Sequence, residues 1–175
     1  MKVTLRPLGD ISDETMESLR DEVNCIFHCP VEVGEGFSHL SYAYDPERKQ
    51  YLGSSLIVWL NALPRERDEK VVGITDVDLY APRLNFIFGE ADVTSGVVVV
   101  SLHRLKQTPY GLVPDKASFI QRATKEIVHE LGHTFGLGHC FNPRCVMRFS
   151  NTLADTDYKE VNFCNECCPR IIYLV

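Results

Sequence analysis

Three histidines and one glutamate follow the spacing of a catalytic zinc site. His129, Glu130 and His133 form an H-E-x-x-H sequence. On a helix, a step of four residues advances about one turn, so both imidazoles project from one face and can share a tetrahedral ion at about 2.1 Å. Glu130 would lie beside the metal without binding it. From there it can take a proton from metal-bound water and pass it to a leaving amine, which predicts a general base.

His139 extends this motif and requires the helix to end. It lies six residues beyond His133, where an unbroken helix would carry it away from the metal-facing side. Gly136 and Gly138 lie between the two histidines, and a glycine at positive φ ends a helix and turns the chain back. Three neutral imidazole nitrogens leave one coordination position for water and substrate. This arrangement is typical of a catalytic zinc rather than a structural one.

Four cysteines downstream are spaced for a second zinc, a structural one. Cys140 and Cys145 form one close pair, and Cys164 and Cys167 form another. Four thiolates fill every position of a tetrahedral ion, so this site would bind no water and would stabilise a segment poor in apolar residues. Two disulfides are the alternative reading of the pairs, and Cys168 is an alternative to Cys167 as fourth ligand. The sequence predicts two zinc ions per chain, one catalytic and one structural.

The elements that must position these residues are a sheet and the helices that cover it. Strands are predicted over residues 3–8, 25–33, 71–79, 85–88 and 96–102, and helices over about 13–23, 50–63 and 116–135. The last strand is apolar on both faces, which indicates a strand covered on both sides and placed at or near the centre of the sheet. Asp115 is the predicted N-cap of the helix that carries the histidine motif.

The composition changes after Gly136, where five of the seven cysteines gather and little periodic pattern remains. Such a segment needs a metal or another crosslink, because it has too few apolar residues for a core of its own. We therefore predict a single catalytic domain over residues 1–175. It would consist of an N-terminal subdomain (1–138) and a cysteine-rich C-terminal subdomain (139–175).

Size and charge limit the classes of function. A chain of 175 residues with 45% hydrophobic residues can bury the core of one domain. The net charge of −6 argues against a surface that follows phosphates, so no nucleic-acid partner is expected. The N-terminus lacks a secretory pattern, and no apolar run is long enough to span a bilayer. These features predict a cytoplasmic protein without a membrane partner, and a monomer by default.

With these motifs identified, the sequence resembles the archaemetzincins, a family in the metzincin clan of zinc metallopeptidases. The resemblance lies in the string from His129 to Cys140, in Cys145-Val-Met147, and in Cys164-Asn-Glu-Cys167. It implies that Met147 forms the Met-turn, a tight turn that places a thioether beneath the metal and its histidines without binding the ion.

The resemblance also implies an α/β (α+β) fold. The expected architecture is a twisted, mostly parallel sheet with a backing helix, an active-site helix and a small C-terminal subdomain held by zinc. An edge strand would lie above the cleft. Residues 86–90 are the candidate for this strand, which could pair with an extended peptide by strand addition.

The predicted function is zinc-dependent hydrolysis of peptide bonds, with a peptide as the substrate. One alternative is a zinc-containing module that binds or regulates peptides without turnover, although the intact Glu130 argues against it. Another is a metal-dependent amidase that acts on a small molecule, because it would use the same residues and the same chemistry. The sequence does not indicate which substrate side chains are preferred.

Overall fold

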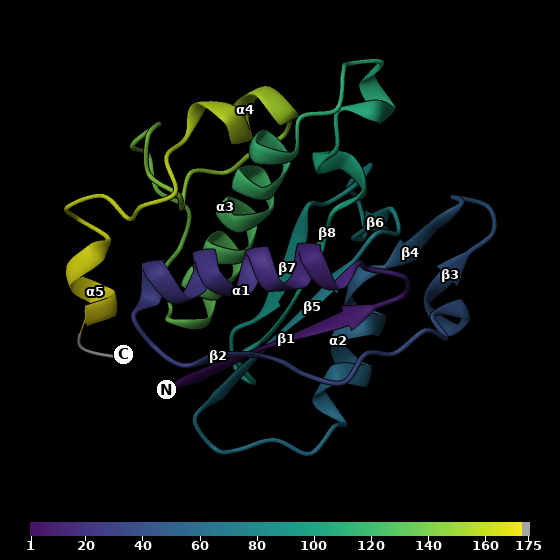
Figure 1. The fold of residues 1–175 in the computed structure, drawn as a ribbon, viewed down its shortest axis with the longest axis horizontal. Coiled ribbons are helices and arrows are strands. Elements are labelled where there is room, and N and C mark those ends of the chain that lie inside the picture. The colour runs from purple at the N-terminus through teal and green to yellow at the C-terminus, as the bar shows by residue number, and fades with distance from the viewer. Residues whose placement is uncertain (173–175) are drawn as a thin grey trace.

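The computed structural model describes residues 1–172 and combines a five-stranded sheet with helices on both faces (Figure 1). The strand order is β2-β1-β5-β8-β7; β7 runs antiparallel to β8, and the other three pairings are parallel. A smaller sheet has the order β3-β4-β6. The strands are β1 (Lys2–Leu8), β2 (Val31–Val33), β3 (Tyr44–Asp45), β4 (Gln50–Leu52), β5 (Glu69–Thr75), β6 (Leu79–Tyr80), β7 (Gly89–Asp92) and β8 (Val97–Ser101).

Five α-helices and three short 3₁₀ helices complete the described part of the chain. The α-helices are α1 (Asp13–Phe27), α2 (Gly53–Asn61), α3 (Lys116–Thr134), α4 (Leu153–Tyr158) and α5 (Cys168–Ile172), and the 3₁₀ helices are η1 (Ser41–Ala43), η2 (His103–Leu105) and η3 (Thr108–Tyr110). In the described residues, none of the helices has both the length and the apolarity to cross a membrane. The last three residues of the predicted C-terminal subdomain lie outside the described residues.

The main sheet is buried on both faces. Helices α1 and α3 cross one face (Figure 1), where Val72 and Val98 pack in a core with residues of both helices. Helix α2 covers the other face, where Val71 and Val97 pack with its apolar side chains. Because successive residues of a strand point to opposite faces, both faces of β5 and β8 must be apolar. All five residues of β8 are buried, as predicted, and β8 lies between the central strand β5 and the edge strand β7.

Helix α1 is longer than predicted, and the strand predicted over residues 25–33 is mostly wrong. The Ser12 side chain accepts a hydrogen bond from the Thr15 backbone N–H and caps the helix, which continues to Phe27. Phe27 is buried in the core beside the α3 side of the sheet. Burial of this aromatic ring favours continued helix over extended chain, and His28 then ends α1 in the left-handed conformation. Only Val31–Val33 forms the strand β2.

Two corrections apply to the middle of the chain. The helix predicted over residues 50–63 begins only at Gly53, because residues 50–52 form β4 and pair with β3 and β6. The strand predicted over residues 71–79 is divided into β5 and β6, which belong to different sheets. The pairing of β4 with β6 joins segments far apart in the sequence, and local patterns carry no signal for it.

The strand predicted over residues 85–88 is wrong, and the candidate edge strand is displaced. The edge strand of the main sheet is β7, Gly89–Asp92, which pairs with β8. In the preceding segment, Ile87 forms an isolated bridge to Leu79. Aromatic residues favour strands because they fit half-buried pleated surfaces. Phe86 and Phe88 pack against each other although they lie outside a continuous strand ladder. Their ring centroids are 5.2 Å apart in an edge-to-face arrangement.

Helix α3 begins and ends as predicted. The Asp115 side chain accepts a hydrogen bond from the Ala117 backbone N–H at the start. At the other end Gly136 has φ 78°, the left-handed conformation that the motif required. The Gly136 N–H donates to the His133 carbonyl, and the Leu137 N–H donates to the Gly132 carbonyl. This pair of bonds is a Schellman motif, which reverses the chain toward His139.

Candidate active site

The first two predicted zinc ligands face each other on α3. The Nε2 atoms of His129 and His133 lie 3.1 Å apart. The Nδ1 atom of each ring lies 2.8 Å from a backbone carbonyl oxygen, that of Val146 for His129 and that of Leu137 for His133. A carbonyl oxygen only accepts, so both Nδ1 atoms must carry the proton and both neutral Nε2 atoms present lone pairs.

This arrangement fits a bound cation. Two unprotonated nitrogens cannot form a hydrogen bond with each other, so their close approach is unfavourable unless a positive ion lies between them. Two ligands at about 2.1 Å from a tetrahedral ion would be about 3.4 Å apart, close to the separation seen here. Hydrogen bonds from the second ring nitrogen to carbonyl groups are also the usual support of metal-binding histidines.

His139 completes the cluster from the chain that follows α3. Its ring centroid lies 5.3 Å from that of His129 and 5.0 Å from that of His133. Candidate ligand atoms of all three residues lie within 4.8 Å of one another. The third imidazole is exposed, whereas His129 is buried and His133 is half-buried. The predicted reversal at Gly136 therefore brings the three histidines together.

Burial keeps the imidazoles neutral. Desolvation lowers the pKa of His129 well below its ordinary value, and positive charge on Lys159 acts in the same direction. Burial also lowers the pKa of His133 and of His139. Metal binding requires neutral imidazole, so these shifts favour the ligand form at neutral pH.

Glu130 is buried beside this cluster. Desolvation raises the pKa of its carboxyl group well above the ordinary value, and the nearby charge of Glu126 raises it further. The side chain lies against β7 at Gly89, where a β-carbon would be 2.6 Å from the Glu130 Cγ and 2.8 Å from its Oε1. Only a residue without a side chain leaves room for the carboxylate at this place. A raised pKa makes the carboxylate a stronger base, as general-base chemistry requires.

A buried ion pair next to Glu130 was missed by the sequence analysis. The Lys159 Nζ lies 3.0 Å from the Glu126 Oε1, and their side chains are 0% and 4% exposed. Thr156 donates a second hydrogen bond to the same oxygen. Glu126 is four residues before Glu130 on α3, which is a weak signal for a polar stripe. Its partner lies in a loop that the sequence does not place.

Met147 lies beneath the histidine-bearing turn of α3. The side chain is fully buried. A β-carbon at Gly132, between the two helical histidines, would overlap the Met147 sulfur. The Met147 carbonyl accepts a hydrogen bond of 2.9 Å from the Cys140 N–H, which joins this turn to the chain beyond His139. The Met147 thioether thus packs against α3 between the two helical histidines, and its assignment as the Met-turn stays a prediction.

The four predicted thiolate ligands also come together. Candidate ligand atoms of Cys140, Cys145, Cys164 and Cys167 lie within 4.8 Å of one another, and the Cys140 and Cys164 sulfurs are 3.8 Å apart. Sulfurs at about 2.3 Å from a tetrahedral zinc are about 3.8 Å apart, so the cluster fits this ion. All seven cysteines are free thiols. Cys168, the alternative ligand, lies outside the group and begins α5.

One thiol of this cluster is poised to ionise. Burial acts to raise the pKa of Cys164, but backbone hydrogen bonds from Cys167 and Glu166 and contacts with Cys145 and Cys140 lower it to about 7. Thiolate is the form that binds metal. The N–H groups that follow Cys164 therefore favour the anionic form that a zinc ligand needs.

A cavity of 380 Å³ opens beside His129 and Glu130. Its walls come from three parts of the chain: residues 83–89, helix α3 and residues 149–151. Its lining residues are Arg83, Leu84, Asn85, Phe86, Ile87, Phe88, Gly89, Glu126, His129, Glu130, Phe149, Ser150 and Asn151. The volume is within the range of small-ligand pockets, and the lining combines apolar side chains with polar and titratable ones.

The fold and these clusters define a zinc-dependent metallopeptidase. The sequence profile of peptidase family M54 matches residues 13–172, and the chain belongs to this family. It is 40% identical over 171 residues to an archaemetzincin from Methanocaldococcus jannaschii, covering 98% of this chain and 93% of that protein. It is also 40% identical over 174 residues to an archaemetzincin from Pyrococcus furiosus, covering 94% and 89%.

Solved structures agree with this assignment. A zinc-dependent peptidase from Methanocorpusculum labreanum superposes with a TM-score of 0.89 at 31% identity, covering 97% of this chain and 99% of that one. An archaemetzincin from Archaeoglobus fulgidus gives a TM-score of 0.85 at 36% identity, covering 98% and 100%. The predicted family and the predicted fold class are therefore confirmed.

Proposed function

We propose that this metallopeptidase hydrolyses peptide bonds with one zinc ion held by His129, His133 and His139 and with Glu130 as general base. The observation that carries the proposal is the facing pair of unprotonated Nε2 atoms 3.1 Å apart, next to a buried carboxylate at the wall of a cavity. Carbonyl groups fix both rings in the ligand tautomer. Glu130 is adjacent in sequence but is directed at β7 and the cavity, which suits a base rather than a ligand.

The chemistry divides between the ion and the protein. Zinc, when bound, supplies a Lewis acid that polarises the scissile carbonyl and acidifies water. Glu130 accepts a proton from the attacking water at its carboxylate and delivers that proton to the amine nitrogen of the leaving product. Its buried surroundings raise the pKa and so strengthen the base. His129 and His133 keep their orientation throughout, because their Nδ1–H groups remain bonded to backbone carbonyls.

The peptide substrate is supported by the shape of the site. Strand β7 is the edge strand of the main sheet and pairs with β8 on one side only. An extended peptide can add to the other side through backbone hydrogen bonds, antiparallel or parallel. Gly89 on this strand touches Glu130, so a peptide paired there would pass beside the proposed base.

The proposed second ion is structural. Cys140, Cys145, Cys164 and Cys167 would hold it with all four positions filled, so it would take no part in hydrolysis. Its role would be to fix the chain beyond α3. Cys140 directly follows His139, so the same ion would also limit the movement of the third histidine.

Substitution of the proposed base is the direct test of the function. Glu130→Gln keeps the shape of the side chain and removes its basicity, so peptide turnover should fall at least about 100-fold while the zinc content stays at the wild-type value. Turnover would be measured with a peptide library, and zinc by atomic emission. Glu17→Gln makes the same chemical change on an exposed position of α1 and should leave both unchanged.

The same assay separates the two alternatives. If the wild type and Glu130→Gln both bind peptides but neither cleaves any of them, a non-catalytic binding module would be favoured. Turnover of N-acylated metabolites without cleavage of peptides would favour a small-molecule amidase. Either result would contradict the proposed peptidase function.

A further inference from the structure

One wall of the cavity is a segment that lies outside the named strands. Residues 83–88 line the cavity opposite α3, and they form no strand. The Ile87 N–H donates to the Leu79 carbonyl at 2.9 Å, and this contact is an isolated bridge. Extended segments outside a ladder have backbone groups that need other partners. The Phe88 carbonyl accepts a further hydrogen bond of 2.8 Å from the Ser101 N–H of β8, so the backbone holds the end of the segment next to β7. The carbonyls of Leu84 and Asn85, farther from β7, have side-chain partners instead.

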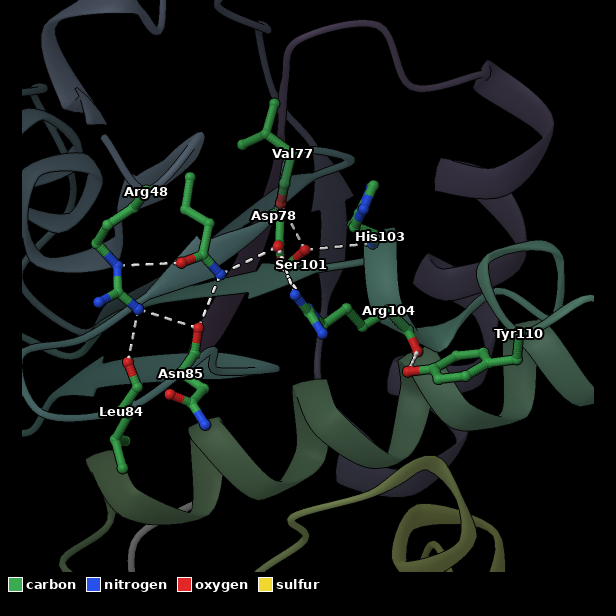
Figure 2. Close-up of polar contacts among 10 residues, drawn as sticks. Arg48, Val77, Asp78, Leu84, Asn85, Ser101, His103, Arg104 and Tyr110 are labelled. Atoms are coloured by element: carbon green, nitrogen blue, oxygen red, sulfur yellow. Dashed lines mark hydrogen bonds and ion pairs between the residues drawn. The ribbon is translucent and has the colours of Figure 1, made fainter. Parts of the chain in front are cut away.

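Two side chains hold the carbonyl groups of this segment from behind. Arg48 donates from Nη2 to the carbonyls of Leu84 and Asn85, at 2.8 and 3.1 Å. Gln50, which is 7% exposed, donates from Nε2 to the Asn85 carbonyl at 2.8 Å and accepts a hydrogen bond from the Arg48 Nε. Figure 2 shows the side chains of Leu84 and Asn85 on the opposite side, extending toward α3. Both residues line the cavity.

A third contact reaches the aromatic part of the wall. Asp78 accepts two hydrogen bonds of 2.7 Å from Arg104, through Nε and Nη2 (Figure 2). The Arg104 guanidinium then lies over the ring of Phe86, 4.3 Å from its centroid. Asp78 also accepts the other hydrogen bond of the Gln50 Nε2, at 3.0 Å. The four polar residues thus form one continuous network behind the wall.

We propose that Arg48, Gln50, Asp78 and Arg104 are positioning residues that fix the 83–88 wall and so set the affinity of the cleft for its peptide. This proposal rests on the peptidase function given above. None of the four lines the cavity, so they would act through Leu84, Asn85 and Phe86. We call the four residues the wall brace.

The wall brace acts by reducing the number of positions open to the wall. A bidentate arginine–carboxylate pair and charge-assisted bonds to carbonyls are the stronger hydrogen bonds in proteins. Without them, only a fraction of molecules would hold the wall in the binding position. The apparent dissociation constant rises by the inverse of that fraction, so a fall to about one tenth raises it about tenfold. The chemical step on molecules that have bound substrate should change little.

The test compares Gln50→Met and Arg48→Met with the wild type. We expect KM for a cleaved peptide to rise about tenfold while kcat stays within about twofold and the zinc content is unchanged. Hydrogen exchange at the amides of residues 84–88 should become faster. Arg48→Lys keeps one charged donor, so its KM should lie between that of Arg48→Met and that of the wild type. Arg6→Met is the matched control, because Arg6 also donates to a backbone carbonyl, that of Glu35, but from β1 and outside the cavity lining.

The outcomes are decisive in either direction. An unchanged KM, an unchanged exchange rate at residues 84–88, or a fall in kcat at constant KM in the Arg48→Met protein would each overturn the proposal. If Gln50→Met does not fold, Arg48→Met decides, since Arg48 is exposed. If the wild type cleaves no peptide, the proposed function fails separately. In that case hydrogen exchange, which needs no substrate, still decides whether the brace fixes the wall.

Discussion

Gly89 shows how much of this site depends on a missing side chain. The carboxyl group of Glu130 occupies the space that a β-carbon at Gly89 would need. The glycine is on the edge strand, and Glu130 is on α3, so two elements approach each other at this one point. A glycine inside a strand normally weakens it, and close approach of another group is a usual reason to find one there.

The variant Gly89→Ala should therefore lower activity without removing the metal ligands. The new methyl group would push the Glu130 carboxylate away by about 1 Å, and a misplacement of this size can reduce kcat about 100-fold. Zinc content should stay at the wild-type value. Steady-state kinetics and metal analysis would check this. A Gly89→Ala protein with normal kcat would show that Glu130 is not confined as described.

The residues found from the sequence are those whose partners are near in the chain. The spacing of His129, Glu130 and His133 reports one helical turn, and the C-x2-C spacing reports a thiolate loop. Gly89 and Lys159 were not found. Gly89 matters because it lies against Glu130, about 40 residues away, and Lys159 because it pairs with Glu126, about 30 residues away. No local sequence pattern indicates such contacts.

At the scale of elements, local sequence patterns predicted the active-site helix correctly but did not predict which strands pair. Helix α3 was placed correctly because an N-cap, a run without proline and a terminating glycine are all local. The strand predicted over residues 85–88 was wrong, because β-branched and aromatic residues indicate a half-buried surface. They do not indicate which segment pairs with it. The polar side chains that replace the ladder come from residues 48, 50, 78 and 104, which the sequence could not bring together.

The Lys159–Glu126 pair connects α3 to the segment after α4, and its loss should be costly. Lys159→Met would leave the Glu126 carboxylate buried without its cation, which typically costs about 3–5 kcal/mol. We expect the free energy of unfolding to fall by about that amount in denaturant titrations. The double variant Glu126→Gln/Lys159→Met should recover much of the loss, because no charge is then buried. A single variant as stable as the wild type would contradict this account.

At the scale of the whole molecule, the two proposed metal sites differ in how exposed their ligands are and in how many positions on the ion the protein would fill. The histidine cluster offers three candidate ligands, of which His139 is exposed, whereas the cysteine cluster offers four, two of them buried. An ion with an open position exchanges more readily than one enclosed by four thiolates. In the part of the chain that the structure describes, the segment after α3 has only two short helices and no strand, so its order should depend on the proposed second ion.

Graded metal removal would separate the two roles. Mild chelation should remove one of two zinc ions and abolish turnover, with a melting temperature close to that of the untreated protein. Strong chelation should remove the second ion and lower the melting temperature by several degrees, because its binding energy contributes to folding. Metal content and thermal unfolding would be measured on the same samples. A stoichiometry of one, or simultaneous loss of both ions, would contradict the two-site proposal.

A single peptide bond joins His139 to Cys140, so one residue of the first cluster is followed at once by one of the second. Adjacent α-carbons are only about 3.8 Å apart. Loops that contain glycines, such as this one, commonly tolerate insertions. Here an added residue would move one cluster out of register with the other, so chain length between the two is fixed even though the neighbouring loop is exposed.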